Sequence, residues 1–554
     1  MGNVIKFKRN IQKLYDRAND KCDDGDYVSA LSSLLNEAEN YLDNAEVCAH
    51  IADIYTELGL YENAIIFWFK YMKRAKKKDY FDGYNGLGAN YYFSGDTRVA
   101  GYYFNEQLSV DPTNSGAYGD ALEEFLDEAF KEERKFHLVK DKTQDEIDGE
   151  IIENAKALNK DGEYQKAIEV LNQITEDRKS FAEALSERAF SHYCLDEIER
   201  AVYYAEKSIE LGFTSIGSLT FIIHLLLSAD KPNAEYYLEL LINFEVEDTE
   251  SKYKKLNALC EFYLFEDAEK LCDELLNEEF YDVNTSFIKA FLTYNRGDYK
   301  GAEQNFRKAY LLSFNPVALY YLRLSQSAIE GKATVGELRV SFDLPYEVIE
   351  DYFNIIKKIA NDHSLIKNYS KRLLTDIADW CFTLGPQQAQ SVLTVCFARS
   401  DDNYYINYLK EVLINPTVRD DVKKHCVAVL YENGVKKGLK VVFSHYFKEI
   451  KTQMVEFKEV NKTVFKKAYC YAIACLSVYE KKRLATLEIG ALELQNELIS
   501  SGMADNEFSV QALACAMYFY SGEKLVPKEL VYHLFKTEKE RVVEILKMTE
   551  INND

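Results

Sequence analysis

The stretch GYNGLGANYYFSGDTRVAGYYF, Gly83 to Phe104, decides the fold that this sequence predicts. Four residues of its first half have the i, i+3, i+4, i+7 spacing of one helix face: Tyr84, Leu87, Gly88 and Tyr91. After the turn SGD comes a second apolar stripe: Ala100, Phe104 and Leu108. The stretch therefore predicts two helices joined by a tight turn, and a glycine inside the first helix lets the second approach closely.

The three glycines Gly83, Gly86 and Gly88 also resemble a loop that holds phosphates. A phosphate loop of the Walker type needs Lys followed by Ser or Thr after its last glycine, and a dinucleotide fingerprint needs a preceding strand. Here Ala89 and Asn90 follow the last glycine, and the residues before Gly83, KRAKKKDYFD, do not form a strand pattern. We interpret the glycines as packing positions and not as a nucleotide site.

This helix pair recurs along the chain. A small residue opens the contact face of each second helix: Ala30, Ala64, Ala100, Ala167, Ala201, Ala234, Ala268 and Ala302. The intervals are 34 and 36 residues, then 67, then 34, 33, 34 and 34. The interval of 67 is close to two periods, so we expect one degenerate repeat within it. A fixed period of this length is typical of a helical repeat array.

The sequence resembles the tetratricopeptide repeat family, whose period is 34 residues. The unit 84–112 matches the family pattern at seven positions: Tyr84 in place of Trp, Leu87, Gly88, Tyr91, Ala100, Phe104 and Pro112. The resemblance covers about residues 11–326. It implies an all-α fold, an α-solenoid of helix pairs, followed by a smaller, mostly helical C-terminal domain.

Five segments follow from this pattern. They are an N-terminal repeat array (1–130), a charged interruption or degenerate repeat (131–149), a second array (150–327), a linker (328–345) and a helical C-terminal domain (346–554). Within the last segment, the helix pair hinged at Pro416 is similar to a HEAT repeat. Residues 439–458 are rich in β-branched and aromatic residues, so a short β-hairpin and a helix both stay open there.

The charge of the chain is uneven. Residues 1–350 carry 39 Lys and Arg against 65 Asp and Glu, a net −26, whereas residues 351–554 have a net charge of +2. Such an acidic surface repels nucleic acid and favours a basic protein or peptide partner. Eleven scattered cysteines without a CxxC pair, no apolar run of membrane-spanning length and no signal peptide predict a cytoplasmic protein.

Motifs for catalysis are absent from the sequence: no HExxH, GxSxG, GKS or GKT motif occurs. The eight histidines lack the spacing of metal ligands. We therefore expect a protein that is not an enzyme and has no cofactor or metal.

The family resemblance implies a scaffold or adaptor for protein–protein interactions, with the first helices of successive repeats lining a concave groove. Carrying the family's groove positions onto this chain gives these residues: Asn85, Ala89, Tyr92, Phe93, Glu183, Phe190, Tyr193, Tyr253, Asn257, Asn284, Phe287, Phe291, Tyr294 and Asn295. Asparagine can both donate to and accept from a peptide backbone, and aromatic rings dominate binding hot spots. The alternative is that these rings pack against adjacent repeats.

Two other functions stay open. Residues 527–547 space their apolar side chains roughly as a helix-turn-helix does, so a peptide-sensing regulator that contacts DNA is one alternative. An enzyme of unrecognised type in the C-terminal domain is the other. The sequence does not indicate the partner, the pathway or the oligomeric state.

Overall fold

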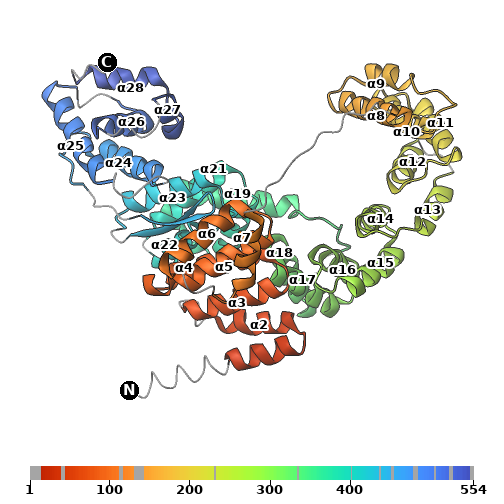
Figure 1. Ribbon diagram of the computed structural model, residues 1–554, viewed down its shortest axis with the longest axis horizontal. Helices are drawn as coiled ribbons and strands as arrows, with labels where there is room; N and C mark the ends of the chain where they lie inside the picture. The colour runs from red at the N-terminus through yellow and green to blue at the C-terminus, as the bar shows by residue number, and fades with distance from the viewer. Residues whose placement is uncertain are drawn as a thin grey trace. The chain divides into compact units, whose positions relative to one another are not determined.

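The computed structural model describes residues 14–38, 44–111, 116–129, 143–229, 233–332, 336–400, 402–435, 438–450, 455–477, 484–503, 507–522 and 528–549 (Figure 1). The chain forms two compact units. Unit 1 comprises residues 1–131, 310–320 and 341–554, and unit 2 comprises residues 132–309 and 321–340. The domain boundaries expected from the sequence stay predictions.

The N-terminal repeats of unit 1 are antiparallel helix pairs. Their elements are α2 (Tyr27–Ala38), α3 (Ala45–Glu57), α4 (Tyr61–Arg74), the 3-10 turn η1 (Lys77–Asp79), α5 (Tyr80–Phe93), α6 (Thr97–Val110) and α7 (Gly119–Ala129). Residues 310–320 also belong to this unit. The Tyr55 hydroxyl donates to the Leu311 carbonyl, and Phe314 packs on Phe67 at 5.6 Å between ring centroids.

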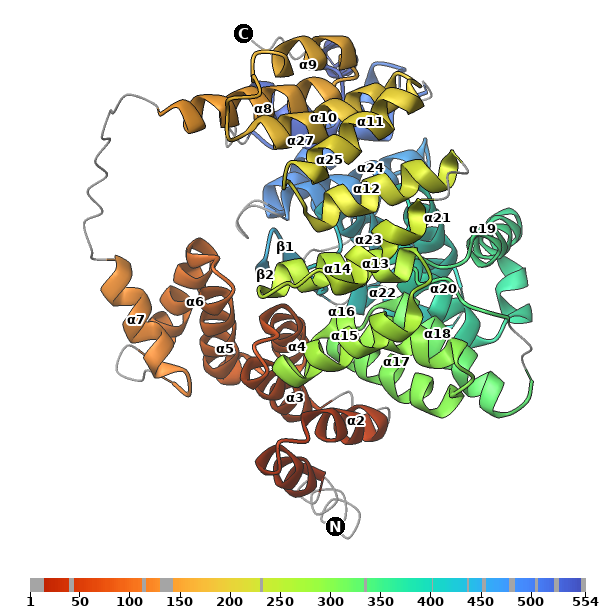
Figure 2. The same ribbon diagram turned by 90° about the vertical axis from the view of Figure 1, so that its right-hand side faces the viewer.

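Unit 2 continues the repeats. Its pairs are α8 (Gln144–Lys160) with α9 (Tyr164–Leu171), α10 (Phe181–Cys194) with α11 (Ile198–Glu210), α12 (Ile216–Ser228) with α13 (Ala234–Asn243), and α14 (Thr249–Glu261) with α15 (Phe265–Glu278). Then come α16 (Val283–Asn295), α17 (Tyr299–Ser313) and α18 (Pro316–Ile329). Figure 2 shows the helices following one another from α8 to α16, as an array of repeats predicts. Residues 144–149 of the expected interruption belong to α8, Thr143 caps its N-terminus, and residues 131–142 lie outside the described residues.

The repeat alanines have the same role in each pair. All eight are buried. Seven of them stand three residues after the start of their helix: Ala30, Ala64, Ala100, Ala167, Ala201, Ala268 and Ala302. The exception is Ala234, which begins α13 itself. The predicted solenoid and its register are confirmed.

The turn before each of those seven helices contains one residue with positive φ, always five positions before the alanine. Glycine supplies it in five repeats: Gly25, Gly59, Gly95, Gly162 and Gly297. Asp196 (φ 62°) and Tyr263 (φ 60°) take the same conformation in the other two. The repeats without glycine therefore keep the turn and carry the strain of a left-handed L-residue.

The glycines of the deciding stretch lie inside α5, a continuous helix. A Cβ atom on Gly88 would stand 2.6 Å from the ring of Phe104 in α6, and one on Gly86 would stand 2.1 Å from the indole of Trp68 in α4. Both glycines are packing positions, as the sequence predicts, and neither lies in a phosphate loop.

The C-terminal part of unit 1 is helical except for one hairpin. Its helices are α19 (Tyr346–Asn361), η2 (His363–Asn368), α20 (Lys371–Thr383), α21 (Gln387–Ala398), α22 (Asn403–Val412), α23 (Asp420–Glu432), α24 (Lys462–Leu476), α25 (Leu484–Ser500), α26 (Val510–Tyr520), α27 (Lys528–Phe535) and α28 (Lys539–Lys547). In the expected helix-turn-helix region, α27 and α28 pack against α26. Val542 and Ile545 of α28 are buried, and Arg541 pairs with Glu538 at 2.9 Å.

The hairpin consists of β1 (Leu439–Phe443) and β2 (Tyr446–Ile450), paired antiparallel with Leu439 opposite Ile450 and Phe443 opposite Tyr446. Both turn residues, Ser444 and His445, have positive φ, as a two-residue hairpin turn of type I′ requires. Of the two alternatives open for residues 439–458, the structure has the hairpin over 439–450, and residues 451–454 lie outside the described residues.

This hairpin packs on the N-terminal repeats. The Lys440 ammonium donates to the Met72 and Lys73 carbonyls at 3.0 and 2.6 Å, which satisfies carbonyls at the end of α4. The amide of Phe447 donates to the Tyr103 hydroxyl at 3.0 Å, and its ring stacks on Phe69. The C-terminal helices and the N-terminal repeats therefore share one core.

Candidate protein-binding grooves

One groove lies on the N-terminal repeats and has a volume of about 1030 Å³. Its walls come from α3, the end of α4, η1, α5 and the residues just before α7. The lining residues are Asn44, Ala45, Glu46, Ala49, His50, Asp53, Trp68, Tyr71, Arg74, Ala75, Lys76, Lys78, Asp79, Asp82, Asn85, Ala117 and Tyr118. We call this the N-terminal groove. The first helices of two successive pairs, α3 and α5, contribute to its wall together with α4 and the connection that follows it.

Polar contacts hold the floor of the N-terminal groove in place. The Asn85 amide donates to Gln107 at 3.0 Å and accepts from the Tyr118 backbone N–H at 2.9 Å. The Tyr118 hydroxyl donates to the Asp53 carboxylate at 2.6 Å. Asn85 is buried, so its amide fixes the positions of Gln107 and Tyr118 beneath the groove surface.

Two polar groups belong to this wall, the Trp68 indole N–H and the Asp53 carboxylate. The indole N–H of Trp68 is buried and has no hydrogen-bond partner among the described residues. Burial raises the pKa of Asp53, and the acidic neighbour Asp82 raises it further, while the Tyr118 hydrogen bond and His50 oppose the shift. A cation placed beside Asp53 would stabilise its charged form.

The N-terminal groove contains charges of both signs. Glu46, Asp53 and Asp82 come from α3 and α5, whereas Lys76, Lys78 and Asp79 lie on the connection that follows α4. Arg74, the last residue of α4, is engaged by Glu411 at 2.8 Å. The wall that α3 and α5 supply is therefore acidic.

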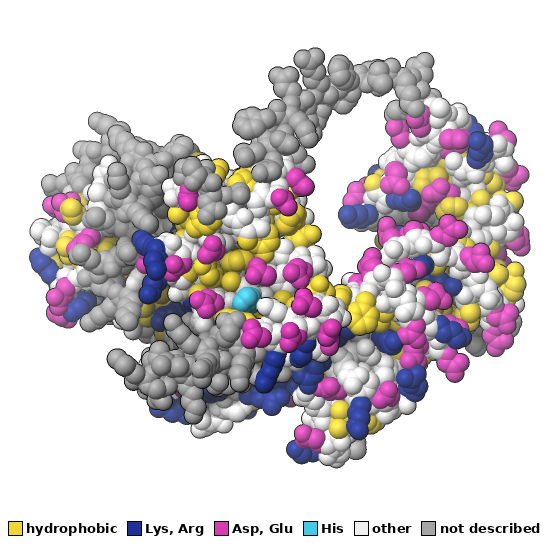
Figure 3. Space-filling view, turned by 60° about the horizontal axis from the view of Figure 1, so that its bottom comes forward, with side chains coloured by type: hydrophobic (Ala, Val, Ile, Leu, Met, Phe, Trp, Pro, Cys, Tyr) yellow, Lys and Arg dark blue, Asp and Glu magenta, His cyan; other side chains and the backbone are white. Residues whose placement is uncertain are grey.

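A second groove, of about 610 Å³, lies in unit 2 between α8, α10 and α12. Phe190 and Phe221 pack at 5.9 Å between ring centroids on its wall. Asn159 accepts from the Ser191 hydroxyl at 2.9 Å, and its amide nitrogen is buried without a partner in the described part of the chain. Acidic side chains spread over the visible face of this unit (Figure 3).

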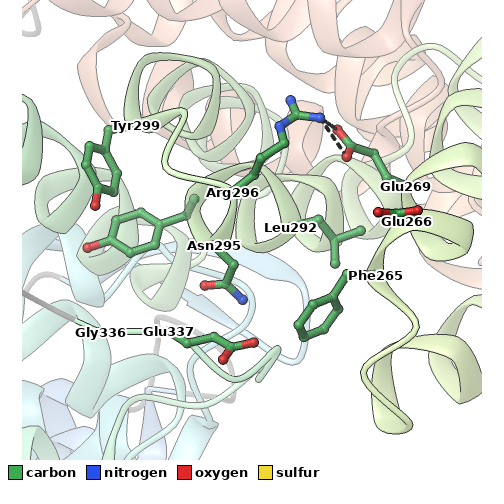
Figure 4. A pocket seen from close by; sticks show the side chains of 10 residues that line it. Phe265, Glu266, Glu269, Leu292, Asn295, Arg296, Tyr299, Gly336 and Glu337 are labelled. Carbon is green, nitrogen blue, oxygen red and sulfur yellow. Dashed lines mark hydrogen bonds and ion pairs between the residues drawn. The ribbon is translucent and has the colours of Figure 1, made fainter.

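A third groove in unit 2, of about 550 Å³, contains one of the predicted asparagines. The Asn295 amide nitrogen donates to the Leu338 carbonyl at 2.8 Å, and the Asn295 oxygen accepts from the Leu338 N–H at 2.8 Å. Figure 4 shows the Asn295 side chain pointing toward the segment that carries Gly336 and Glu337. Across the groove, Arg296 forms a two-pronged ion pair with Glu269.

The structure distributes the predicted site residues over three environments. Five line grooves: Asn85 in the N-terminal groove, Glu183 and Phe190 in the second, Tyr294 and Asn295 in the third. Six are exposed or half-buried outside these grooves: Tyr92, Phe93, Tyr193, Tyr253, Asn257 and Asn284. Three are buried: Ala89, Phe287 and Phe291.

The buried rings pack within the repeats. Phe287 and Phe291 lie 5.0 Å apart between centroids, and both contact Phe306 and Tyr321. Tyr92 packs on Phe125 at 6.2 Å, and Phe93 contacts Tyr61 at 5.3 Å. A role of any of these residues in binding stays a prediction.

Of the seventeen residues that line the N-terminal groove, only Asn85 is among the predicted site residues; Asp53, Trp68 and Tyr118 are among those that the sequence does not predict. Trp68 lies on the second helix of its pair, where the repeat pattern places no groove position. Tyr118 lies in the degenerate repeat, whose register the pattern does not give. Asp53 stands one repeat before the best-matched unit, and extending that register backwards would have pointed to it.

Other kinds of site were sought in the described residues. They contain no group of three or more His, Cys, Asp or Glu placed to hold a metal ion. None of their helices is long and apolar enough to cross a bilayer.

Comparison with known proteins bears on this architecture. A tetratricopeptide repeat model matches residues 45–67, which cover α3 and the first half of α4. The helix pair α3 and α4 is therefore similar to a tetratricopeptide repeat. Repeats of this kind indicate a protein-interaction scaffold, because stacked units create extended concave binding surfaces.

Two solved structures are similar to this chain. The P58(IPK) TPR domain has 16% sequence identity and a TM-score of 0.20, and the match covers 59% of this chain and all of that one. Yeast Tom70 has 10% identity and a TM-score of 0.19, covering 98% of this chain and 95% of its own. No curated protein matches the sequence. Similarity at this level carries no information on the partner.

Proposed function

We propose that this protein is a non-enzymatic scaffold that holds a segment of a partner protein in the N-terminal groove. The observation that carries the proposal is the groove of about 1030 Å³ along α3 and α5, the first helices of successive repeats. Tetratricopeptide repeats elsewhere in the chain extend the surface on which a partner can be held.

The chemistry of the groove favours a basic segment with one hydrogen-bond acceptor. Asp53 and Asp82 would pair with a Lys or Arg side chain of the partner. The Trp68 N–H would donate to a partner carbonyl and so satisfy a donor that is buried without one among the described residues. The rings of Trp68, Tyr71 and Tyr118 supply aromatic contact area with few rotatable bonds.

Selection from a library of random 12-residue peptides, panned against the full chain, tests this function. We expect the selected peptides to be enriched in Lys and Arg. Asp53→Asn should weaken their binding at least tenfold, about 1.4 kcal/mol, because the charge at the wall is removed. The matched control is Glu62→Gln, since Glu62 is exposed on α4 and does not line the groove.

Fluorescence anisotropy with one selected peptide measures both variants, and a thermal melt by circular dichroism verifies that each is folded. Equal affinity for the wild type and a folded Asp53→Asn variant would reject the N-terminal groove as the binding site. Selected peptides without basic residues would reject the basic partner.

We also propose a cytoplasmic location. All eleven cysteines are free thiols, and eight of them are buried, which suits a reducing compartment. Imaging of the tagged protein in its native cell checks this location, and a signal confined to the secretory pathway would contradict it.

A further inference from the structure

One wall of the third groove comes from a segment that includes Gly336 and Glu337. Residues 336–340 run through unit 2 without helix or strand assignment, after the end of α18 at Ile329. The Leu338 backbone exchanges two hydrogen bonds with the Asn295 amide, each 2.8 Å long. A side-chain amide that donates to and accepts from the backbone of one residue recognises that backbone whatever the side chain is.

Side chains of this segment alternate in their exposure. Leu338 is buried, and Val340 is half-buried against the apolar core of unit 2. Glu337 and Arg339 between and beside them are exposed. This period of two is that of an extended chain lying on a surface with one face inward. The groove therefore selects an extended backbone with an apolar side chain at the position of Leu338.

The segment does not fill its groove. A volume of about 550 Å³ remains beside it, lined by the apolar side chains of Phe265 and Leu292, by Tyr299, and by the Arg296–Glu269 ion pair. Figure 4 shows these side chains gathered around Asn295 and Glu337. A longer or bulkier ligand would thus find further contacts that residues 336–340 do not use.

We propose that the Asn295 groove is a binding site for extended peptides with an apolar side chain, and that residues 336–340 occupy it as an internal competitor. An external peptide must displace a ligand that is tethered to the same chain, whose effective concentration is on the order of millimolar. Binding at this site is therefore weak until the segment is released. The site lies in unit 2 and is separate from the N-terminal groove, so either can fail without the other.

A peptide with the sequence of residues 336–342, GELRVSF, labelled at its N-terminus and amidated at its C-terminus, is the probe. We expect it to bind full-length Leu338→Asp at least tenfold more tightly than the wild type, because the variant removes the internal competitor and leaves the groove intact. Arg339→Ser is the matched control, since Arg339 belongs to the same segment but is exposed; it should bind the probe as the wild type does. A probe peptide with Asp in place of Leu should bind none of these proteins.

Two further measurements test whether the probe binds at Asn295 and whether the segment is released. In the Leu338→Asp chain, adding Asn295→Ala should abolish probe binding, because the backbone of the probe loses both hydrogen bonds. Hydrogen–deuterium exchange of the segment should be faster in Leu338→Asp than in the wild type and unchanged in Arg339→Ser.

If Leu338→Asp does not fold, a chain in which residues 336–340 are replaced by glycine and serine takes its place in the same titration. Equal binding of the probe to wild type and released chain, or binding to neither, would overturn the proposal. So would binding that survives Asn295→Ala.

Discussion

At the scale of single residues, the close spacing of α5 and α6 depends on a glycine, which has no side chain. Gly88 lies on the face of α5 that meets α6, and the Phe104 ring occupies the space that a methyl group would need. Helix glycine ordinarily costs stability relative to alanine. Here the close approach that it permits outweighs this cost, because Phe104 and its neighbours are fully buried.

Gly88→Ala should destabilise the protein by about 1–3 kcal/mol, because its methyl group overpacks the contact with Phe104. Gly149→Ala is the matched control. Gly149 also lies inside a helix, α8, but a Cβ atom there meets nothing within 4 Å. This substitution should stabilise unit 2 by about 0.4–1 kcal/mol.

Urea unfolding followed by far-ultraviolet circular dichroism measures both changes. A Gly88→Ala variant as stable as the wild type would show that the glycine is not a packing position.

At the scale of elements, the repeat alanines and turn glycines predict where each second helix begins. These signals are local, because a helix pair and its turn lie within 34 residues, so the sequence pattern contains them. The turn conformation persists even where the glycine does not, at Asp196 and Tyr263. Packing of the neighbouring pairs thus imposes the left-handed residue.

Gly297→Ala should therefore cost about 1–2 kcal/mol, because alanine must adopt the positive φ of 85° that glycine takes freely. The converse change Tyr263→Gly relieves strain at the corresponding position of the preceding repeat and should not destabilise the chain. Thermal melts of the two variants check this pair of expectations. Loss of stability in Tyr263→Gly would mean that the exposed Tyr263 ring, which contacts Phe265, contributes more than its backbone costs.

At the scale of the whole molecule, the contacts that the sequence does not predict are those between distant segments. Lys440 and Met72 are 368 residues apart, and Asn295 and Leu338 are 43 apart. No periodicity connects such pairs, because each is a single contact and not a repeated one. Asn295 is predicted as a groove residue, but nothing in the sequence indicates that the chain supplies its own ligand.

The N-terminal groove also combines features that the sequence predicts with features that it does not. Its location on α3 and α5 follows from the repeat register, and Asn85 is among the predicted lining residues. Trp68 lies on the second helix of its pair, where the pattern places no groove position, and Tyr118 lies in the degenerate repeat, whose register the pattern does not give.

The central claim is that the first helices of the N-terminal repeats hold the partner. Hydrogen–deuterium exchange of the full chain, with and without a peptide selected from the random library, tests it most directly. The peptide should slow exchange in residues 45–57 and 79–93, which supply eight of the seventeen residues that line the groove, while residues 528–547 stay unchanged. Slower exchange confined to residues 528–547, or none in α3 and α5 at saturating peptide, would contradict the account.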